Sequence, residues 1–115
     1  MYAVCMKETH IRQLLCGNVE TLVLKVLYGG ALHVYGIRKT LYERSNGYLG
    51  LAEGRLYPLL RQMESRGLVC GCNAISCTGR RVREYSLTQI GRSELDTQIK
   101  AWSIFAQKMN KVFNS

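Results

Sequence analysis

The sequence predicts a mostly α-helical fold with one small β-hairpin and a long C-terminal helix, and three observations lead to this prediction. Apolar residues recur at helical spacing in successive segments of the chain. Between residues 68 and 87, two runs with strand character flank a glycine-containing turn. The last helical pattern, which Thr88 is expected to cap, runs to about Phe113 and gives a rod of roughly 39 Å. Such a rod is too long to fold back on the small core that 115 residues allow.

The first part of the chain is predicted to form a leading helix and a first core helix. Residues 7–16 carry apolar side chains on one side and are expected to form a short leading helix, which Gly17 ends. Asn18 is expected to cap the next helix, because its side-chain oxygen can accept a hydrogen bond from a free backbone N–H of the first turn. That helix runs to about Tyr28. Its predicted core residues are Val19, Leu22, Val23, Val26 and Leu27.

Two further core helices follow a pair of glycines. Residues 29–30 end the first core helix, and residues 31–32 are expected to form a short edge strand. The second core helix spans about residues 34–44, a polar turn occupies residues 45–47, and the third core helix spans about residues 53–66. The predicted core residues of these two helices are Val34, Ile37, Leu41, Leu56, Leu59, Leu60 and Met63.

A basic hairpin follows the third core helix. Residues 68–75 and 82–87 are predicted to pair as its strands, with Gly79 near the tip. Residues 76–83 hold three arginines and no acidic residue. A basic helix followed by a basic hairpin is the layout of a winged helix-turn-helix, in which the helix lies in the major groove of DNA and the wing along the backbone. The order of these elements therefore predicts a winged helix-turn-helix.

The net charge agrees with a nucleic-acid partner. The chain has 16 Lys and Arg against 8 Asp and Glu, a formal net charge of +8. This excess alone also fits solubility or adhesion to any polyanion, and its placement on a predicted wing is what favours DNA. Arg55 lies in the first turn of the third core helix, where it can pair with guanine O6 and N7, although a solvated surface position is the plain alternative for any single arginine. The residues that this pattern predicts to contact DNA are Tyr35, Lys39, Arg55, Arg61, Gln62, Arg80, Arg81 and Arg83.

The apolar residues of the C-terminal helix repeat at heptad spacing, with intervals of 4, 3, 4, 3 and 4. Such a seam is typical of a helix that packs on a partner, whereas packing on the chain's own core is the alternative. A two-fold dimer places two recognition helices about 34 Å apart, which suits a palindromic operator in double-stranded DNA. We therefore predict a DNA-binding domain over residues 1–88 and a dimerisation helix over residues 89–115. The predicted dimer interface is Leu95, Ile99, Trp102, Ala106, Met109 and Phe113.

The cysteines do not form a recognisable framework. Their number is odd and the N-terminus lacks the features of an export signal, so secreted disulfides are not expected. Cys70 and Cys72 share one face of a predicted strand, where they could bind a metal together or be oxidised with Cys77. Buried or incidental thiols are the simpler interpretation, because a zinc site needs four ligands, and no metal or cofactor is predicted. The five cysteines are Cys5, Cys16, Cys70, Cys72 and Cys77.

Other classes of function find no support in the sequence. No apolar run approaches the roughly 18 residues that a membrane span needs, so a cytoplasmic protein without a membrane partner is expected. Asp96 is the only aspartate and lies on the predicted dimer helix. No histidine stands in a motif beside a nucleophile, and no glycine-rich loop joins a strand to a helix. An enzyme is therefore not predicted.

Five motifs follow one another along the chain, at residues 17–24, 33–37, 53–60, 79–81 and 85–91. Their wording, order and spacing resemble those of the PadR family of bacterial transcriptional regulators. The resemblance covers about residues 17–113, nearly the whole chain. The chain departs from the family at Val34, where glycine is frequent, at Val82, which interrupts a basic run, and at Glu84, where an aromatic residue is common.

The resemblance implies roles for three aromatic residues. It implies that Tyr57 contacts a phosphate, whereas packing against the helix over residues 34–44 is an equally good interpretation. It also implies that Trp102 and Phe105 line a cavity between paired C-terminal helices and bind a planar aromatic effector there. The alternative for Trp102 is an interface residue that only packs.

The combined prediction is a ligand-responsive, homodimeric repressor that binds a specific DNA sequence. An effector that binds two arrangements of the dimer with different affinities would release the DNA by changing the angle between the protomers. Two rivals stand beside this prediction. One is a regulator that senses thiol oxidation or a metal through Cys70, Cys72 and Cys77. The other is a small-molecule-binding or protein-interaction module whose basic face is incidental.

Overall fold

The structure, a computed structural model, describes the backbone of residues 4–115 and the side chains of residues 10–115. The predicted mostly helical fold is confirmed, and the leading helix begins three residues earlier than expected. Within residues 4–115, no helix is both long and apolar enough to cross a bilayer. The elements are, in order, α1 (Val4–Leu15), α2 (Val19–Tyr28), α3 (Val34–Arg44), α4 (Glu53–Ser65), β1 (Val69–Ile75), β2 (Arg81–Leu87) and α5 (Gln89–Phe113).

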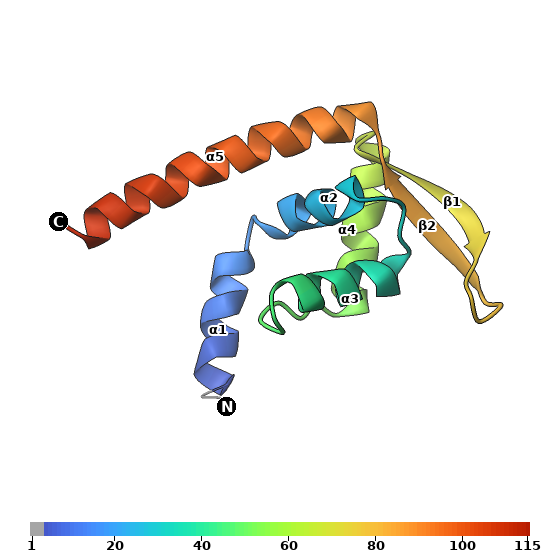
Figure 1. The fold of residues 1–115 in the computed structure, drawn as a ribbon, viewed down its shortest axis with the longest axis horizontal. Coiled ribbons are helices and arrows are strands. Elements are labelled where there is room, and N and C mark those ends of the chain that lie inside the picture. Colours follow the sequence, from blue (N-terminus) through green and yellow to red (C-terminus); the bar gives the residue numbers. More distant parts are fainter. Residues whose placement is uncertain (1–3) are drawn as a thin grey trace.

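Helices α2, α3 and α4 pack together, and the hairpin of β1 and β2 projects to one side of them (Figure 1). Two backbone hydrogen bonds join Leu32 and Tyr85, at 2.9 and 3.0 Å, so residue 32 forms an isolated bridge to β2, and the short edge strand expected at residues 31–32 is reduced to this bridge beside a two-stranded sheet. This arrangement is a winged helix-turn-helix. Helix α5 begins at the base of the hairpin, packs on α2 and then extends past the body, on the side opposite α3 (Figure 1).

One hydrophobic core holds these elements together. The predicted core residues of α2, α3 and α4 are buried, except that Leu22 and Leu59 are only partly so. Burial of one such aliphatic side chain contributes about 1.5–3 kcal/mol to folding. The hairpin adds Val69 and Tyr85 to the core, and α5 adds Leu95. The hairpin and the first part of α5 are therefore anchored to the three central helices.

One predicted helix cap is confirmed and another is wrong. Thr88 caps α5, because its Oγ1 accepts a hydrogen bond from the backbone N–H of Gly91 (3.0 Å). Asn18 precedes α2, but its side chain makes no capping hydrogen bond. Its amide instead donates backwards to the carbonyl of Leu14 (2.6 Å). The reason is its backbone, with φ −111° and ψ −11°, whereas a capping side chain usually needs an extended residue.

Two glycines are required by close contacts or by a turn. Gly91 lies against the carbonyl of Leu68, where a Cβ would be 2.1 Å from the oxygen. A side chain there would push the start of α5 away from the base of the hairpin. Gly79 has a φ of +83°, and its N–H donates to the carbonyl of Ser76 (2.9 Å), which closes the hairpin tip at the predicted position.

Candidate nucleic-acid interface

Helix α4 presents three different sides. Its core side consists of Leu56, Leu60 and Met63, which are fully buried. Tyr57 and Arg61 are exposed and lie one turn apart, so they share a second side. Arg55 is exposed as well, but it lies on a third side, which borders a cavity together with Leu59. The structure therefore separates Arg55 from Tyr57 and Arg61, although the sequence groups all three.

Helix α3 contributes two members of the predicted set. Tyr35 and Lys39 are exposed and lie one turn apart on it. The start of this helix is fixed by His33, whose Nδ1 accepts a hydrogen bond from the backbone N–H of Gly36 (3.1 Å). His33 is thus the N-cap of the helix that carries Tyr35.

Arg38 joins α3 to the beginning of α4. Its Nε donates to the carbonyl of Leu51 (2.6 Å), and its Nη1 lies 3.3 Å from Oε1 of Glu53. Because Glu53 is the first residue of α4, these contacts fix the position of α3 relative to the start of α4. Arg38 is thus engaged within the protein, whereas its neighbour Lys39 forms no ion pair with any side chain of residues 10–115.

The arginines of the wing differ in their surroundings. Arg80 and Arg81 are exposed at the tip, and neither forms an ion pair within the part of the chain whose side chains are described. Arg83 points back towards α4, where its Nη2 lies 2.7 Å from Oε2 of Glu64. The hydrogen bond to Glu64 and the charge of that carboxylate raise the pKa of Arg83 above its usual value. Arg80 and Arg81 are therefore free for a ligand, and Arg83 is occupied.

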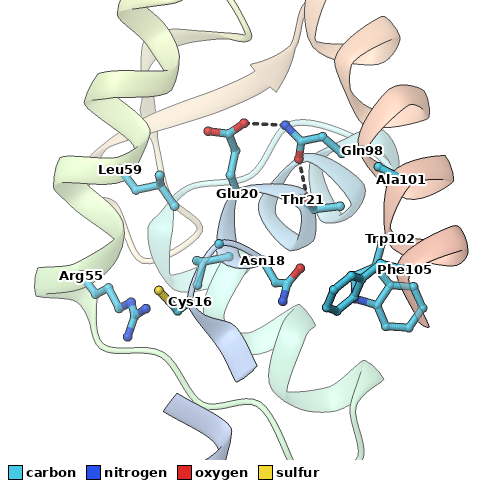
Figure 2. Close-up of a pocket in the computed structure, with 12 residues that line it drawn as sticks. Cys16, Asn18, Glu20, Thr21, Arg55, Leu59, Gln98, Ala101, Trp102 and Phe105 are labelled. Carbon is cyan, nitrogen blue, oxygen red and sulfur yellow. Dashed lines mark hydrogen bonds between the residues drawn. The ribbon is translucent and has the colours of Figure 1, made fainter. Parts of the chain in front are cut away.

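A cavity of about 610 Å³ lies between α2, α4 and α5. Figure 2 shows Trp102 and Phe105 of α5 on one side of it and Arg55 on the other, with Cys16 and Asn18 between them. The two aromatic residues that the family resemblance connected with an effector both line this cavity. It lies within one protomer, whereas the resemblance implies a cavity between paired C-terminal helices. The structure also adds Arg55 to the lining, which the sequence did not suggest.

A polar cluster at the rim of this cavity joins three helices. Glu20 of α2 accepts a hydrogen bond from Nη1 of Arg66, directly after α4, at 2.6 Å. It accepts a second one from Nε2 of Gln98 in α5, also at 2.6 Å (Figure 2). Gln98 also accepts from Thr21 and donates to Glu94 (2.8 Å). These residues were not predicted, because Glu20 and Gln98 are 78 positions apart and no local pattern pairs them.

The predicted dimer stripe on α5 is divided by the structure. Leu95 is only 3% exposed and belongs to the protomer's own core, so its assignment to the interface is wrong. The other predicted residues lie farther along the rod: Ile99, Trp102 and Phe113 are exposed, and Ala106 and Met109 are partly buried. The heptad spacing does not show where α5 stops packing on its own protomer, because a core contact and a contact with a partner need the same apolar side chains.

The cysteines are more accessible than expected. Cys16, Cys70, Cys72 and Cys77 are free and exposed. Of the two simpler interpretations for Cys70, Cys72 and Cys77, buried or incidental thiols, burial is therefore wrong. Cys5 lies outside the described side chains. Within the described residues, no three histidine, cysteine or acidic side chains gather as a metal site. Cys70 and Cys72 alternate with Gly71 along β1 and so share one face of the hairpin.

Comparison with known proteins assigns this architecture to a family. The model of the PadR-like family of transcriptional regulators matches residues 23–97, more than half of the chain. A search of curated proteins finds no significant match. The solved structures give many matches.

A PadR family transcriptional regulator from Eggerthella lenta has a TM-score of 0.81 at 22% identity, with 96% of this chain and 95% of the other covered. A PadR-like transcriptional regulator from Bacillus cereus has a TM-score of 0.77 at 24% identity, with 90% and 98% covered. A PadR family transcription regulator from Clostridium difficile is 29% identical, with a TM-score of 0.72 and coverage of 83% and 97%. The likeness extends over nearly the full length of each of these proteins.

Proposed function

Because the chain belongs to the PadR-like family of transcriptional regulators, we propose that it binds a specific sequence of double-stranded DNA and represses transcription in the cytoplasm. The observation that carries this proposal is the set of exposed basic and tyrosine side chains on α3, α4 and the hairpin tip. Helix α4 enters the major groove, and the wing follows the backbone beside it. The residues proposed to contact DNA are Tyr35, Lys39, Arg55, Tyr57, Arg61, Gln62, Arg80 and Arg81.

The acting unit is proposed to be a homodimer on a palindromic operator. Beyond Leu95, α5 extends past the body with Ile99, Trp102 and Phe113 exposed. Removing such surface from water contributes about 25 cal/mol per Å², which favours association with a second α5. A two-fold pair then offers two α4 helices to successive major grooves, about 34 Å apart. In this proposal residues 1–88 bind DNA and α5 holds the dimer.

A planar aromatic compound is the proposed inducer. The cavity of about 610 Å³ is within the size range of small-molecule sites, and it is open to solvent, with the exposed Trp102 and Phe105 on its wall. An occupant would touch α2, α4 and α5 together, because all three line the cavity. A compound that binds the DNA-released arrangement about 100-fold more tightly supplies roughly 2.7 kcal/mol, enough to change promoter occupancy.

Selection of duplexes from a random-sequence pool tests this function. Affinity for the selected duplex should fall steeply with salt and stay about 10³-fold or more above affinity for a scrambled duplex. Equal affinity for the two would favour an interaction module whose basic face is incidental. Sedimentation at micromolar concentration should show a dimer, and single subunits both with and without DNA would refute the dimeric arrangement.

The exposed thiols favour one second candidate, a regulator that responds to oxidation or to a metal. Cys70 and Cys72 share a face of the hairpin that solvent reaches, so oxidants and soft metal ions have access to them. Replacing Cys70, Cys72 and Cys77 with serine should leave induction by an aromatic compound intact if Trp102 carries the response. Loss of induction in that variant would favour the thiols as the sensor.

A further inference from the structure

The side chain of Arg83 lies on the face of the hairpin that is turned towards α4. It stands opposite Asn73 in the register and two residues from Tyr85, so it shares with the buried Tyr85 the face that looks towards α4. Its Nη2 is 2.7 Å from Oε2 of Glu64 on that helix. The guanidinium carbon also lies 6.0 Å from the centre of the Tyr85 ring. The side chain is thus directed along the sheet towards the recognition helix.

Gly71 provides the space that this direction needs. A Cβ at Gly71 would be 2.7 Å from Nε of Arg83 and 3.0 Å from its Cζ, so the guanidinium occupies the place of a side chain. The backbone N–H of Gly71 points to the same carboxylate, with its nitrogen 3.3 Å from Oε2 of Glu64. Glu64 therefore binds both strands of the wing, β1 through Gly71 and β2 through Arg83.

We propose that Arg83 is a positioning residue, which fixes the wing to α4 through Glu64 and does not itself contact DNA. This inference rests on the proposed binding of DNA by α4 and the wing. It follows that the arginines of the hairpin have two different roles. Arg80 and Arg81 neutralise phosphates, and Arg83 sets the angle at which they reach the backbone while α4 lies in the groove.

Gly71→Ala tests this role without changing any charge. The new methyl group takes the place of the guanidinium, and it displaces only the end of a flexible side chain. Affinity for the selected duplex should fall by roughly two- to fivefold, the range expected when an exposed ion pair that orders the free protein is lost. The slope of log affinity against log salt should not change, because no phosphate contact is lost. Arg83→Ala should behave in the same way, whereas the control Arg81→Ala should reduce the slope by about 1.

Two results would overturn the proposal. Unchanged or tighter binding by Gly71→Ala, together with a slope reduced by about 1 in Arg83→Ala, would make Arg83 a phosphate contact. A second readout needs no DNA: the amide of Gly71 should lose protection from hydrogen exchange in Glu64→Ala and in Arg83→Ala. Unaltered protection in both variants refutes the positioning role, whatever the affinities of the variants for DNA. If instead protection is lost but the wild-type protein binds selected and scrambled duplexes equally, the proposed DNA-binding function fails and the attachment of the wing stands.

Discussion

Replacing Glu20 with alanine should loosen the junction of α2, α4 and α5. The carboxylate accepts one hydrogen bond from Arg66 and one from Gln98, each at 2.6 Å. Arg66 is 45% exposed, so we count its ion pair as at most about 1 kcal/mol. Gln98 is partly buried and donates to a charged acceptor, which contributes about 1.5 kcal/mol. Glu20→Ala should therefore lower the free energy of unfolding by about 2 kcal/mol.

Thermal unfolding followed by circular dichroism measures this loss. About 2 kcal/mol corresponds to a melting temperature roughly 8 °C lower for a chain of this size. Protein concentration must be held constant across the variants, because dimerisation would itself shift the transition. The control is Glu43→Ala, which removes an exposed acid of α3 that pairs with no side chain of residues 10–115, and its effect should stay within about 0.5 kcal/mol.

A double variant separates this junction from a general loss of charge. Gln98→Ala removes one of the hydrogen bonds that Glu20→Ala also removes, so the combined loss should be smaller than the sum of the two single losses. Equal melting temperatures for Glu20→Ala and Glu43→Ala would refute the reasoning. So would full additivity of Glu20→Ala and Gln98→Ala, since the carboxylate would then not connect α2 with α5.

Three other substitutions test the site and the rod. Arg55→Ala should cost about 1–3 kcal/mol on the selected duplex and relax the preference at one base position, as measured by binding to single-base variants of that duplex. An unchanged preference, together with altered ligand binding, would assign Arg55 to the cavity. Trp102→Ala should weaken the dimer in sedimentation or abolish the quenching of tryptophan fluorescence by aromatic compounds, and normal dimerisation with normal ligand affinity would remove Trp102 from both roles. Leu95→Ala should destabilise the protomer by about 2–5 kcal/mol in urea unfolding and leave the dimer dissociation constant unchanged, because this side chain is buried in the protomer's own core. A weaker dimer of normal stability would return Leu95 to the interface.

The sequence predicts those parts of the fold that depend on local periodicity. Helical spacing of apolar residues identifies Ile37, Leu56 and Leu60 as core residues, and the structure buries all three completely. The hairpin is equally local, because Gly79 adopts the left-handed backbone that its turn requires. In such segments the residues that decide the structure are neighbours in the chain.

The sequence fails where a residue's partner is distant or where one pattern has two explanations. Leu95 continues the same seam as Ile99, yet the first packs on the protomer and the second is exposed. Arg83 belongs to a basic run, and only the strand register shows that it faces Glu64, 19 positions away. Asn18 has the chemistry of a helix cap, but the tight turn after α1 directs its amide backwards to Leu14. The register and the turns are tertiary information that composition does not carry.

Two ion pairs lie at the C-terminal end of helix α4, and a third, between Arg38 and Glu53, lies at its N-terminal end. Glu64 holds the wing through Arg83, and Arg66 holds α2 through Glu20. In a recognition helix, the N-terminal residues contact the base edges. The N-terminal half of α4 carries Tyr57 and other exposed side chains that are free to enter a groove. Because the wing, α4 and α2 are tied together at the C-terminal end of α4, and Gln98 and Leu95 anchor the first part of α5 to them, these elements should move as a unit relative to the exposed C-terminal part of α5. In the proposed dimer, a compound bound in the cavity should therefore change the angle between the protomers more than the fold of either one, and such a rigid-body change would alter the spacing of the two α4 helices.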